Sequence, residues 1–502
     1  MTEFVVSLSI ILFRPLRLLL GPLHHRRRSL SASEEGREAT FEALAAPWDS
    51  DPRWYRQDFP PRRRNRIRLL THGDQYFTDL CQELRTAQIR VTIAAWALTP
   101  LMAVERAEDG STTILAELLG EVSRNADVFV LLWSGASALF QPDTKTVEKA
   151  RAQLLEIAPD LRCELDRTAV FSHDHHQKAV TIDGRIAYVG GMDLSTFQGD
   201  RWDTAQHPLR SGVGWHDVQV RLEGDIVEDV ETNFCQRWRE AVGDNIKPIP
   251  PTSDETWDTP CQLIRTIPRA FYPQTVPYGH FGIRHALLET IAAAQEFIYL
   301  ENQYLWAPEI VDALCEAMDR QNPDRFRIVV VLPARAYDGR YDNDDHVRKL
   351  VKHDAGRGVF AAYTLYSSGP AQSQTGYQYS PIYVHSKTTI VDDAWLVVGS
   401  ANLNRRGLAT DSEIALQSQN SRQARRLRLE LWSEHLGIPV AELSAREPGE
   451  LIDGAWKAQA AEMQRRHDAG LPGPGWHVYP YAYRGSPQTR LLDHFQSLTL
   501  EH

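Results

Sequence analysis

Short apolar runs alternate with stretches of helical spacing along most of the chain. The runs are rich in Val, Ile, Leu and aromatic residues, as buried strands are, and they occupy residues 87–93, 128–133, 294–300 and 328–332. Apolar positions recur every three or four residues in 113–124 and 309–320, which predicts an amphipathic helix in each. The alternation predicts an α/β fold with mostly parallel sheets flanked by helices.

The same order of segments occurs twice. The run at 87–93 corresponds to the run at 294–300, and the run at 128–133 corresponds to that at 328–332. The octapeptide His-Gln-Lys-Ala-Val-Thr-Ile-Asp at 176–183 is similar to His-Ser-Lys-Thr-Thr-Ile-Val-Asp at 385–392. Because a nearly constant offset means that whole units of helix and strand recur, the chain is predicted to contain two similar halves.

Composition along the chain suggests where these halves begin and end. Four prolines break any regular element in residues 243–260, which predicts a linker there. The expected parts are an N-terminal extension, a first half, a second half and a C-terminal extension, at 1–60, 61–247, 248–438 and 439–502. Residues 367–380 are rich in Ser, Gln, Gly and Tyr, and we expect a loop over the functional site there.

The N-terminal segment has an apolar run at 4–13 that Arg14 and Pro15 interrupt. This is well short of the roughly 18–20 residues that a transmembrane helix needs. A cleaved signal peptide, an arm lying on anionic lipid and a solvated extension are the three alternatives, and the solvated extension agrees best with the scattered charges. The compartment stays open, and we expect a soluble protein that reaches membranes peripherally.

Charge and cysteine content exclude several classes of protein and kinds of site. The 502 residues carry a formal net charge of -11, with 42% hydrophobic and 24% charged residues, which is typical of a folded globular protein. An acidic total argues against a protein that coats nucleic acid. The five cysteines form no C-x-x-C pair, so neither a disulfide framework nor a structural zinc site is indicated.

The repeated octapeptides carry the candidate chemistry. Each has the spacing H-x-K-x4-D, given by His176, Lys178 and Asp183 and by His385, Lys387 and Asp392. On a strand, residues two apart share a face, so each His and Lys can meet one ligand while the Asp points away and holds the structure. A single H-x-K is a weak signal, but the full pattern found twice in one chain is a strong one.

This doubled motif resembles the signature of the phospholipase D superfamily, and the resemblance covers roughly residues 65–440. Further similar segments are Trp215-His216-Asp217-Val218, Glu301-Asn302-Gln303-Tyr304 and Leu431-Trp432 with Glu434-His435-Leu436-Gly437. The second half also has the family's Gly399-Ser400-Ala401-Asn402. The first half departs from it with Gly190-Gly191-Met192-Asp193, a variant similar to the true phospholipases, and is followed by Asp203.

The resemblance implies two halves about a pseudo-two-fold axis with one shared active site and no cofactor or metal. It implies that His176 is the nucleophile, which becomes a phosphohistidine, and that His385 is the acid and then the base. The residues alone leave the reverse order open. Asp193, Ser400 and Asn402 are expected to support the site.

The residue types suit attack on a phosphodiester. Lys178 and Lys387 can hold the negative charge of the phosphate, and one imidazole must be neutral while the other is protonated. A carboxylate would hold the tautomer of each imidazole. The candidates at matching positions are Asp217 for His176 and Glu413 for His385.

The expected activity is hydrolysis of glycerophospholipids to phosphatidic acid and a free head group, with transfer to alcohols, by a monomer at a membrane surface. One alternative is phosphatidyl transfer as in cardiolipin synthases, which usually carry transmembrane helices. A nuclease fits less well with the negative charge, and no nucleic acid partner is expected. A non-enzymatic lipid-binding protein would be expected to have lost one of the four His and Lys residues.

Two further groups of residues have plainer interpretations. His173, Asp174 and His175 precede His176, but the two neighbouring histidines fall on the opposite strand face, so a polar strand end is favoured over a metal site. Six aromatic residues near the second motif could contact lipid, although packing in the core or in loops is favoured: Trp306, Tyr337, Tyr341, Tyr377, Tyr379 and Tyr383.

Overall fold

The computed structural model describes residues 51–483 except 108, 136–141, 170–172, 252–256, 337–339 and 372–375, and it leaves the side chains of 340–342 undescribed as well. The apolar and basic segment of the expected N-terminal extension lies outside the described residues. Those from Pro52 onward belong to one compact unit.

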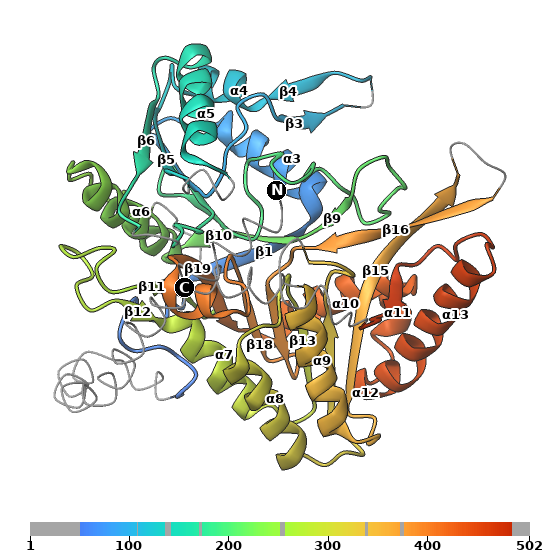
Figure 1. Cartoon of the computed structure of the whole chain (residues 1–502). Coiled ribbons are helices and arrows are strands. Elements are labelled where there is room, and N and C mark those ends of the chain that lie inside the picture. The colour runs from blue at the N-terminus through green and yellow to red at the C-terminus, as the bar shows by residue number, and fades with distance from the viewer. Residues whose placement is uncertain are drawn as a thin grey trace, which may run out of the picture. The chain divides into compact units, whose positions relative to one another are not determined.

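The first sheet takes its strands from the first half of the sequence. Its order is β1-β10-β8-β7-β2-β5-β6 (Figure 1). These are β1 (Asn65–Thr71), β2 (Arg90–Ala95), β5 (Asp127–Trp133), β6 (Arg162–Asp166), β7 (Ala179–Ile182), β8 (Ile186–Gly190) and β10 (Val218–Gly224). Strands β3 (Ala103–Arg106) and β4 (Thr112–Ile114) form a separate ribbon.

The second sheet repeats this order and extends it. It runs β12-β11-β19-β18-β17-β13-β14-β15-β16-β9, and β20 pairs with β15. These are β9 (Gly214–His216), β11 (Cys261–Ile267), β12 (His280–Phe281), β13 (Phe297–Glu301), β14 (Arg327–Val331), β15 (Phe360–Pro370), β16 (Tyr377–Val384), β17 (Thr388–Val391), β18 (Trp395–Gly399), β19 (Glu413–Gln419) and β20 (Val478–Pro480). The path β11-β19-β18-β17-β13-β14-β15 matches the first sheet strand for strand.

The α/β class and the repeat are confirmed, but the sheets are mixed rather than mostly parallel. In the first sheet only the pairs β2–β5 and β5–β6 are parallel, and β13–β14 and β14–β15 correspond to them in the second. Parallel neighbours need a crossover connection, whereas β7–β8 and β17–β18 are joined by tight turns that force antiparallel pairing.

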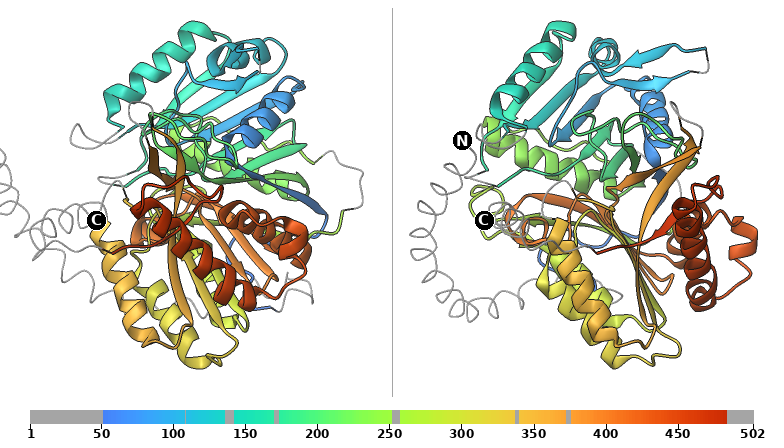
Figure 2. Two further views of the ribbon diagram at one scale, coloured as in Figure 1. Left: turned by 90° about the vertical axis from the view of Figure 1, so that its right-hand side faces the viewer. Right: turned by 45° about the vertical axis from the view of Figure 1, so that its right-hand side comes forward.

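Helices cover the sheets and bury three large apolar clusters. The first-half helices are α3 (His72–Leu84), α4 (Leu115–Val122), α5 (Thr144–Ile157) and α6 (Ile226–Val242). In Figure 2 the second sheet lies between α7 (Gly282–Ala293), α8 (Pro308–Arg320) and α9 (Arg340–Asp354) on one side and the C-terminal helices on the other. A central cluster joins strands of both sheets, from Leu69 and Val220 to Val329 and Leu396. Apolar burial therefore connects the two halves.

The C-terminal helices are α10 (Ser421–Leu436), α11 (Val440–Leu443), α12 (Pro448–Leu451) and α13 (Lys457–Asp468), with a π-helical turn at Ile452–Trp456 and another at Arg406–Thr410. The prediction of a loop at 367–380 is wrong, because most of this segment forms the antiparallel hairpin of β15 and β16. Within the described part of the chain, we find no helix with the length and apolar character that crossing a membrane requires.

The Asp that ends each H-x-K-x4-D motif fastens the start of a neighbouring strand. The Asp183 carboxylate accepts hydrogen bonds from the backbone N–H groups of Gln88, Ile89 and Arg90 at 2.8–2.9 Å. Asp392 does the same for residues 295–297 at 2.8 Å. Both aspartates have positive φ, 55° and 54°, a conformation that Asp tolerates better than most residues. They therefore hold the sheet in place and do not line the pocket described below.

Candidate active site

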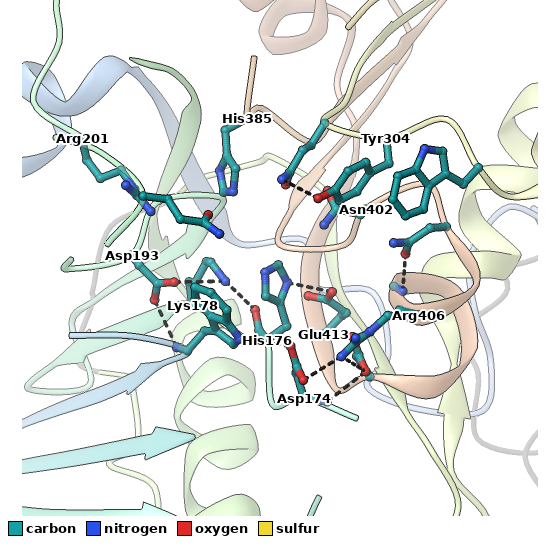
Figure 3. A pocket seen from close by; sticks show the side chains of 17 residues that line it. Asp174, His176, Lys178, Asp193, Arg201, Tyr304, His385, Asn402, Arg406 and Glu413 are labelled. Atoms are coloured by element: carbon teal, nitrogen blue, oxygen red, sulfur yellow. Dashed lines mark hydrogen bonds and ion pairs between the residues drawn. The ribbon is translucent and has the colours of Figure 1, made fainter. Parts of the chain in front are cut away.

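One pocket collects polar side chains from both halves of the sequence (Figure 3). Its lining includes predicted site residues from the first half, His176, Lys178 and Asp193, and from the second, His385, Asn402 and Glu413. Trp96, Gln303, Tyr304 and Trp306 contribute amide and aromatic surface. The lining also includes the cationic side chains Lys178, Arg201 and Arg406, which suit a small anionic group.

Each H-x-K segment lies just ahead of a strand rather than within it. His176 and Lys178 precede β7, and His385 and Lys387 precede β17. Each lysine Nζ donates a hydrogen bond to the backbone carbonyl of the histidine two residues earlier, at 2.9 Å for Lys178 and 2.5 Å for Lys387. The extended backbone thus keeps imidazole and ammonium close together, as the spacing predicts.

The histidine–carboxylate pairs are crossed between the halves, which corrects the pairing expected from the sequence. His176 Nδ1 lies 2.9 Å from Glu413 Oε1, and His385 Nδ1 lies 2.7 Å from Asp217 Oδ2. The reason is backbone pairing between the halves. Strand β9, which ends just before Asp217, pairs with β16, which ends just before His385.

The other pair is brought together in the same way. The backbone N–H of His176 donates to the carbonyl of Ser412 at 2.9 Å, which sets the neighbouring Glu413 against the imidazole. Ser400 Oγ donates to Glu413 Oε2 and accepts from the Ile414 N–H at 3.0 Å. The predicted supporting residue Ser400 therefore fixes a carboxyl group and does not line the pocket.

The Asp217 carboxylate lies against Gly191 of the Gly-Gly segment. It accepts a hydrogen bond from the Val218 N–H at 2.9 Å. A Cβ atom at Gly191 would lie 2.2 Å from Asp217 Oδ1, closer than any side chain allows. The glycine of the variant motif thus leaves room for the carboxylate that contacts His385.

The two carboxyl groups differ in charge. Burial raises the pKa of Glu413 well above its ordinary value, although Lys178 and Ser400 act in the opposite direction. Burial would also raise the pKa of Asp217, but His385 and Lys387 outweigh it, and the pKa lies below the ordinary value. Asp217 is therefore the ionised carboxylate of the site, and Glu413 is the one that tends to be neutral.

Both imidazoles have a lowered pKa when no ligand occupies the site. Burial, together with the charges of Lys178 and Lys387, lowers the pKa of His176 well below its ordinary value. Burial and Lys387 lower the pKa of His385 to about 3. A bound phosphate would add negative charge beside these groups and favour their protonated forms.

The lysines have different partners. Lys178 Nζ lies 3.3 Å from Asp193 Oδ2, so the Asp of the variant motif contacts the ammonium directly. Lys387 Nζ donates to Gln303 Oε1 at 3.3 Å. Asn402, at the position that matches Asp193, lines the pocket, and its buried Oδ1 forms no hydrogen bond with the described residues. The two halves are thus unlike in charge at this position.

Sequence reasoning missed a buried ionic group beside His176. Arg406 lies 2.6 Å from Asp174 and 2.7 Å from Asp411, and Trp96 Nε1 donates to Asp174 at 3.1 Å. Arg201 also lines the pocket and lies over the Trp215 ring at 3.8 Å. Arg406 and Trp96 stand outside the repeated octapeptides, so the motif spacing gave no signal for them.

Among the residues that were given plainer interpretations, Asp174 and Trp306 line the pocket, and His175 does not. His175 is buried, with its ring nitrogens 2.8 Å from Thr168 Oγ1 and 2.9 Å from Ser412 Oγ. Trp306 and Tyr383 are buried, whereas Tyr377 is exposed. The side chains of Tyr337 and Tyr341 lie outside the described residues.

Comparisons with known proteins find phospholipase D-like relatives. The family model described as "Cardiolipin synthase, PLD-like domain" matches residues 287–434. Phospholipase D A of Dictyostelium discoideum is 26% identical over 76% of this chain and 36% of its own length. Phospholipase D alpha 1 of Cynara cardunculus is 27% identical over 60% of this chain and 54% of its own length. The chain thus spans between a third and a little over half of these two relatives.

The fold also has a solved counterpart. The crystal structure of phosphatidylserine synthase from Haemophilus influenzae superposes with a TM-score of 0.51 and 12% sequence identity, and the match covers 81% of this chain and 95% of the other. At this identity the likeness concerns the fold.

Proposed function

Because the chain belongs to the phospholipase D superfamily, we propose that it hydrolyses glycerophospholipids to phosphatidic acid and a free head group. The observation that carries the proposal is the pair of crossed dyads, His176–Glu413 and His385–Asp217, which border one pocket together with Lys178. Two imidazoles beside two ammonium groups suit a displacement at phosphorus in two steps.

In the first step the phosphate lies between Lys178 and Lys387, which offset its negative charge. His176 Nε2 attacks phosphorus while the bond to the head-group oxygen breaks, and His385 gives its proton to that oxygen. The lipid phosphate is then bonded to His176, and the head group leaves with its oxygen protonated, as an alcohol. His385 is left neutral.

In the second step water enters where the head group left. His385 removes a proton from the water as its oxygen attacks phosphorus, and the bond from phosphorus to His176 breaks. Phosphatidic acid leaves, His176 is again neutral, and His385 again carries the proton. The cycle balances without a further reactant.

The charges of the carboxyl groups support this assignment of the histidines. The ionised Asp217 favours the imidazolium form of His385, as an acid requires, because it offsets the positive charge. Glu413 has a raised pKa and therefore stabilises the charged form of His176 less. The His176 imidazole thus stays neutral, as a nucleophile requires.

We propose that the protein acts as a monomer at a membrane surface and has no nucleic acid substrate.

A second candidate function is phosphatidyl transfer to an alcohol for lipid synthesis. The family model that matches residues 287–434 carries the name of a cardiolipin synthase, which is why this candidate is kept. Transfer would use the same covalent step, with an alcohol in place of water.

The test is product analysis with defined substrates. The protein is incubated with vesicles of phosphatidylcholine and phosphatidylethanolamine, and in parallel with single-stranded DNA, and the products are measured by mass spectrometry. We expect phosphatidic acid with choline or ethanolamine, and no product from His385→Asn protein. DNA cleavage without lipid turnover would contradict the proposal, and turnover only when an alcohol is added would favour the transferase.

A further inference from the structure

A cluster of imidazoles lies behind the strand that leads to Asp217. It consists of His72 at the start of α3, His207 in the loop before β9, His216 at the end of β9, and Glu434 in α10. The three imidazoles have no exposed side-chain surface and that of Glu434 is 4% exposed. Because neighbouring side chains of an extended segment point to opposite sides, His216 points away from the side where Asp217 meets His385.

The imidazoles converge on one carboxylate. His72 Nε2 lies 2.6 Å from Glu434 Oε2, and His207 Nε2 and His216 Nδ1 lie 3.1 and 3.2 Å from Oε1. The ring centres are 4.7, 5.1 and 5.9 Å apart. Three imidazoles on a tetrahedral zinc ion, with Zn–N bonds of about 2.0–2.1 Å, place their ring centres about 5 Å apart. The spacing therefore fits a common metal.

The far nitrogens of two of these rings meet further carboxylates. His216 Nε2 lies 2.9 Å from Glu301 Oε2, and His207 Nδ1 lies 3.1 Å from Asp203 Oδ2. A carboxylate on the outer nitrogen is the usual means by which proteins orient a histidine that binds a metal. Glu301 is itself held by His435 Nε2 at 2.8 Å and by the Tyr299 hydroxyl at 2.5 Å.

The inner nitrogen of His216 faces the centre of the cluster. This Nδ1 atom is fully buried, and it meets Glu434 Oε1 at 3.2 Å without forming a well-aligned hydrogen bond. Buried polar atoms are nearly always well paired, so a poorly aligned contact at this point agrees with an ion at the centre of the cluster.

We propose that His72, His207, His216 and Glu434 bind one Zn²⁺ ion at a structural site separate from the catalytic pocket. Four protein ligands, with no solvent-exposed side, are the arrangement of structural rather than catalytic zinc. The ion would tie α3, the loop with His207, β9 and α10 together. It would also steady the catalytic side, since the His216 carbonyl accepts hydrogen bonds from the N–H groups of His385 at 2.8 Å and Ser386 at 3.2 Å.

The test is the metal content of the full chain, purified without an affinity tag and without chelators. We expect about one zinc per chain by plasma mass spectrometry. His72→Gln and Glu434→Gln should each hold at least about tenfold less. The matched control is His477→Gln. His477 is also buried and its ring lies 5.1 Å from that of His207, but its nitrogens face the carbonyls of Tyr366 and Ala205, so zinc should be retained.

A second measurement covers variants that do not fold. Wild-type protein produced in cobalt medium should show the visible absorption bands of tetrahedral Co²⁺, and added Zn²⁺ should raise the melting temperature of metal-depleted protein. Folded wild-type protein that contains no metal and is not stabilised by Zn²⁺ would overturn the proposal. So would full zinc content in folded His72→Gln. Because neither readout uses lipid turnover, failure here is distinct from failure of the proposed function.

Discussion

The two histidines of the pocket differ in the carboxyl group that each one meets. Asp217 is ionised beside His385, while the Glu413 carboxyl beside His176 has a raised pKa. A carboxylate that is ionised both orients the imidazole and stabilises its charged form, whereas a neutral carboxyl group only orients it. The local charges thus give two chemically similar dyads different tasks.

The amide variants of these carboxyl groups should therefore be unequal. Asp217→Asn should lower kcat by about 10³- to 10⁴-fold, because His385 loses the charge that favours its protonated form. Glu413→Gln should lower kcat by about 10- to 100-fold, because mainly orientation is affected. Steady-state kinetics on phosphatidylcholine vesicles measures both. A larger loss in Glu413→Gln than in Asp217→Asn would show that the roles of the histidines are reversed.

The alkaline side of the pH profile should depend on Lys387. Burial, reinforced by the charge of Lys178, lowers the pKa of Lys387 to about 7 in the free enzyme. As the pH rises through this value the ammonium loses its proton and the phosphate loses a positive partner, so kcat/KM should fall above about pH 7.

Arginine stays charged over this range, so Lys387→Arg should move the fall in kcat/KM to higher pH, although its absolute activity will be lower because a guanidinium does not fit the space of an ammonium. Lys178→Arg is the matched control and should keep the wild-type alkaline limb. An unchanged limb in Lys387→Arg would exclude this lysine as its source.

At the scale of elements, the motif aspartates connect strands that are distant in sequence. Asp183 joins the end of β7 to the start of β2, and Asp392 joins the end of β17 to the start of β13. These contacts explain why the repeat includes both the motif and the short segment some 90 residues before it. Each Asp stabilises the sheet and affects the pocket only indirectly, through the backbone.

Replacement of Asp183 by Ala should lower the free energy of unfolding by about 2–4 kcal/mol, since backbone N–H groups lose charged hydrogen bonds. Denaturation with urea, followed by fluorescence, measures the change. The exposed Asp160 provides the control, and Asp160→Ala should change stability by less than about 0.5 kcal/mol. Equal stability of the two variants would contradict a structural role for Asp183.

The sequence was sufficient to predict the repeated α/β units, the strands β2, β5, β13 and β14, and the meeting of His176, Lys178 and His385 at one pocket, because each follows from a local pattern. The crossed dyads were not predictable in this way. They depend on β9, which lies in the first half of the sequence but pairs with β16 of the second sheet. The antiparallel hairpins and the Arg406–Asp174 contact likewise arise from pairing across the chain, which spacing along it does not record.

At the scale of the whole molecule, each half supplies the carboxyl group that contacts the histidine of the other half, and together they form one pocket. Glu413 of the second half contacts His176 of the first, and Asp217 of the first contacts His385 of the second. The apolar cluster that joins strands of both sheets holds this exchange in register. In the proposed reaction a single phosphate lies between these two unlike dyads, and the difference between the dyads accounts for the covalent step.

The most direct test of that covalent step is hydrolysis of phosphatidylcholine in the presence of increasing ethanol. If His176 carries the lipid phosphate after choline has left, ethanol competes with water for the same intermediate. The account predicts that phosphatidylethanol appears beside phosphatidic acid and that its share rises with ethanol, while the rate of choline release changes little. Phosphatidic acid as the single lipid product at every ethanol concentration, with undiminished choline release, would contradict it.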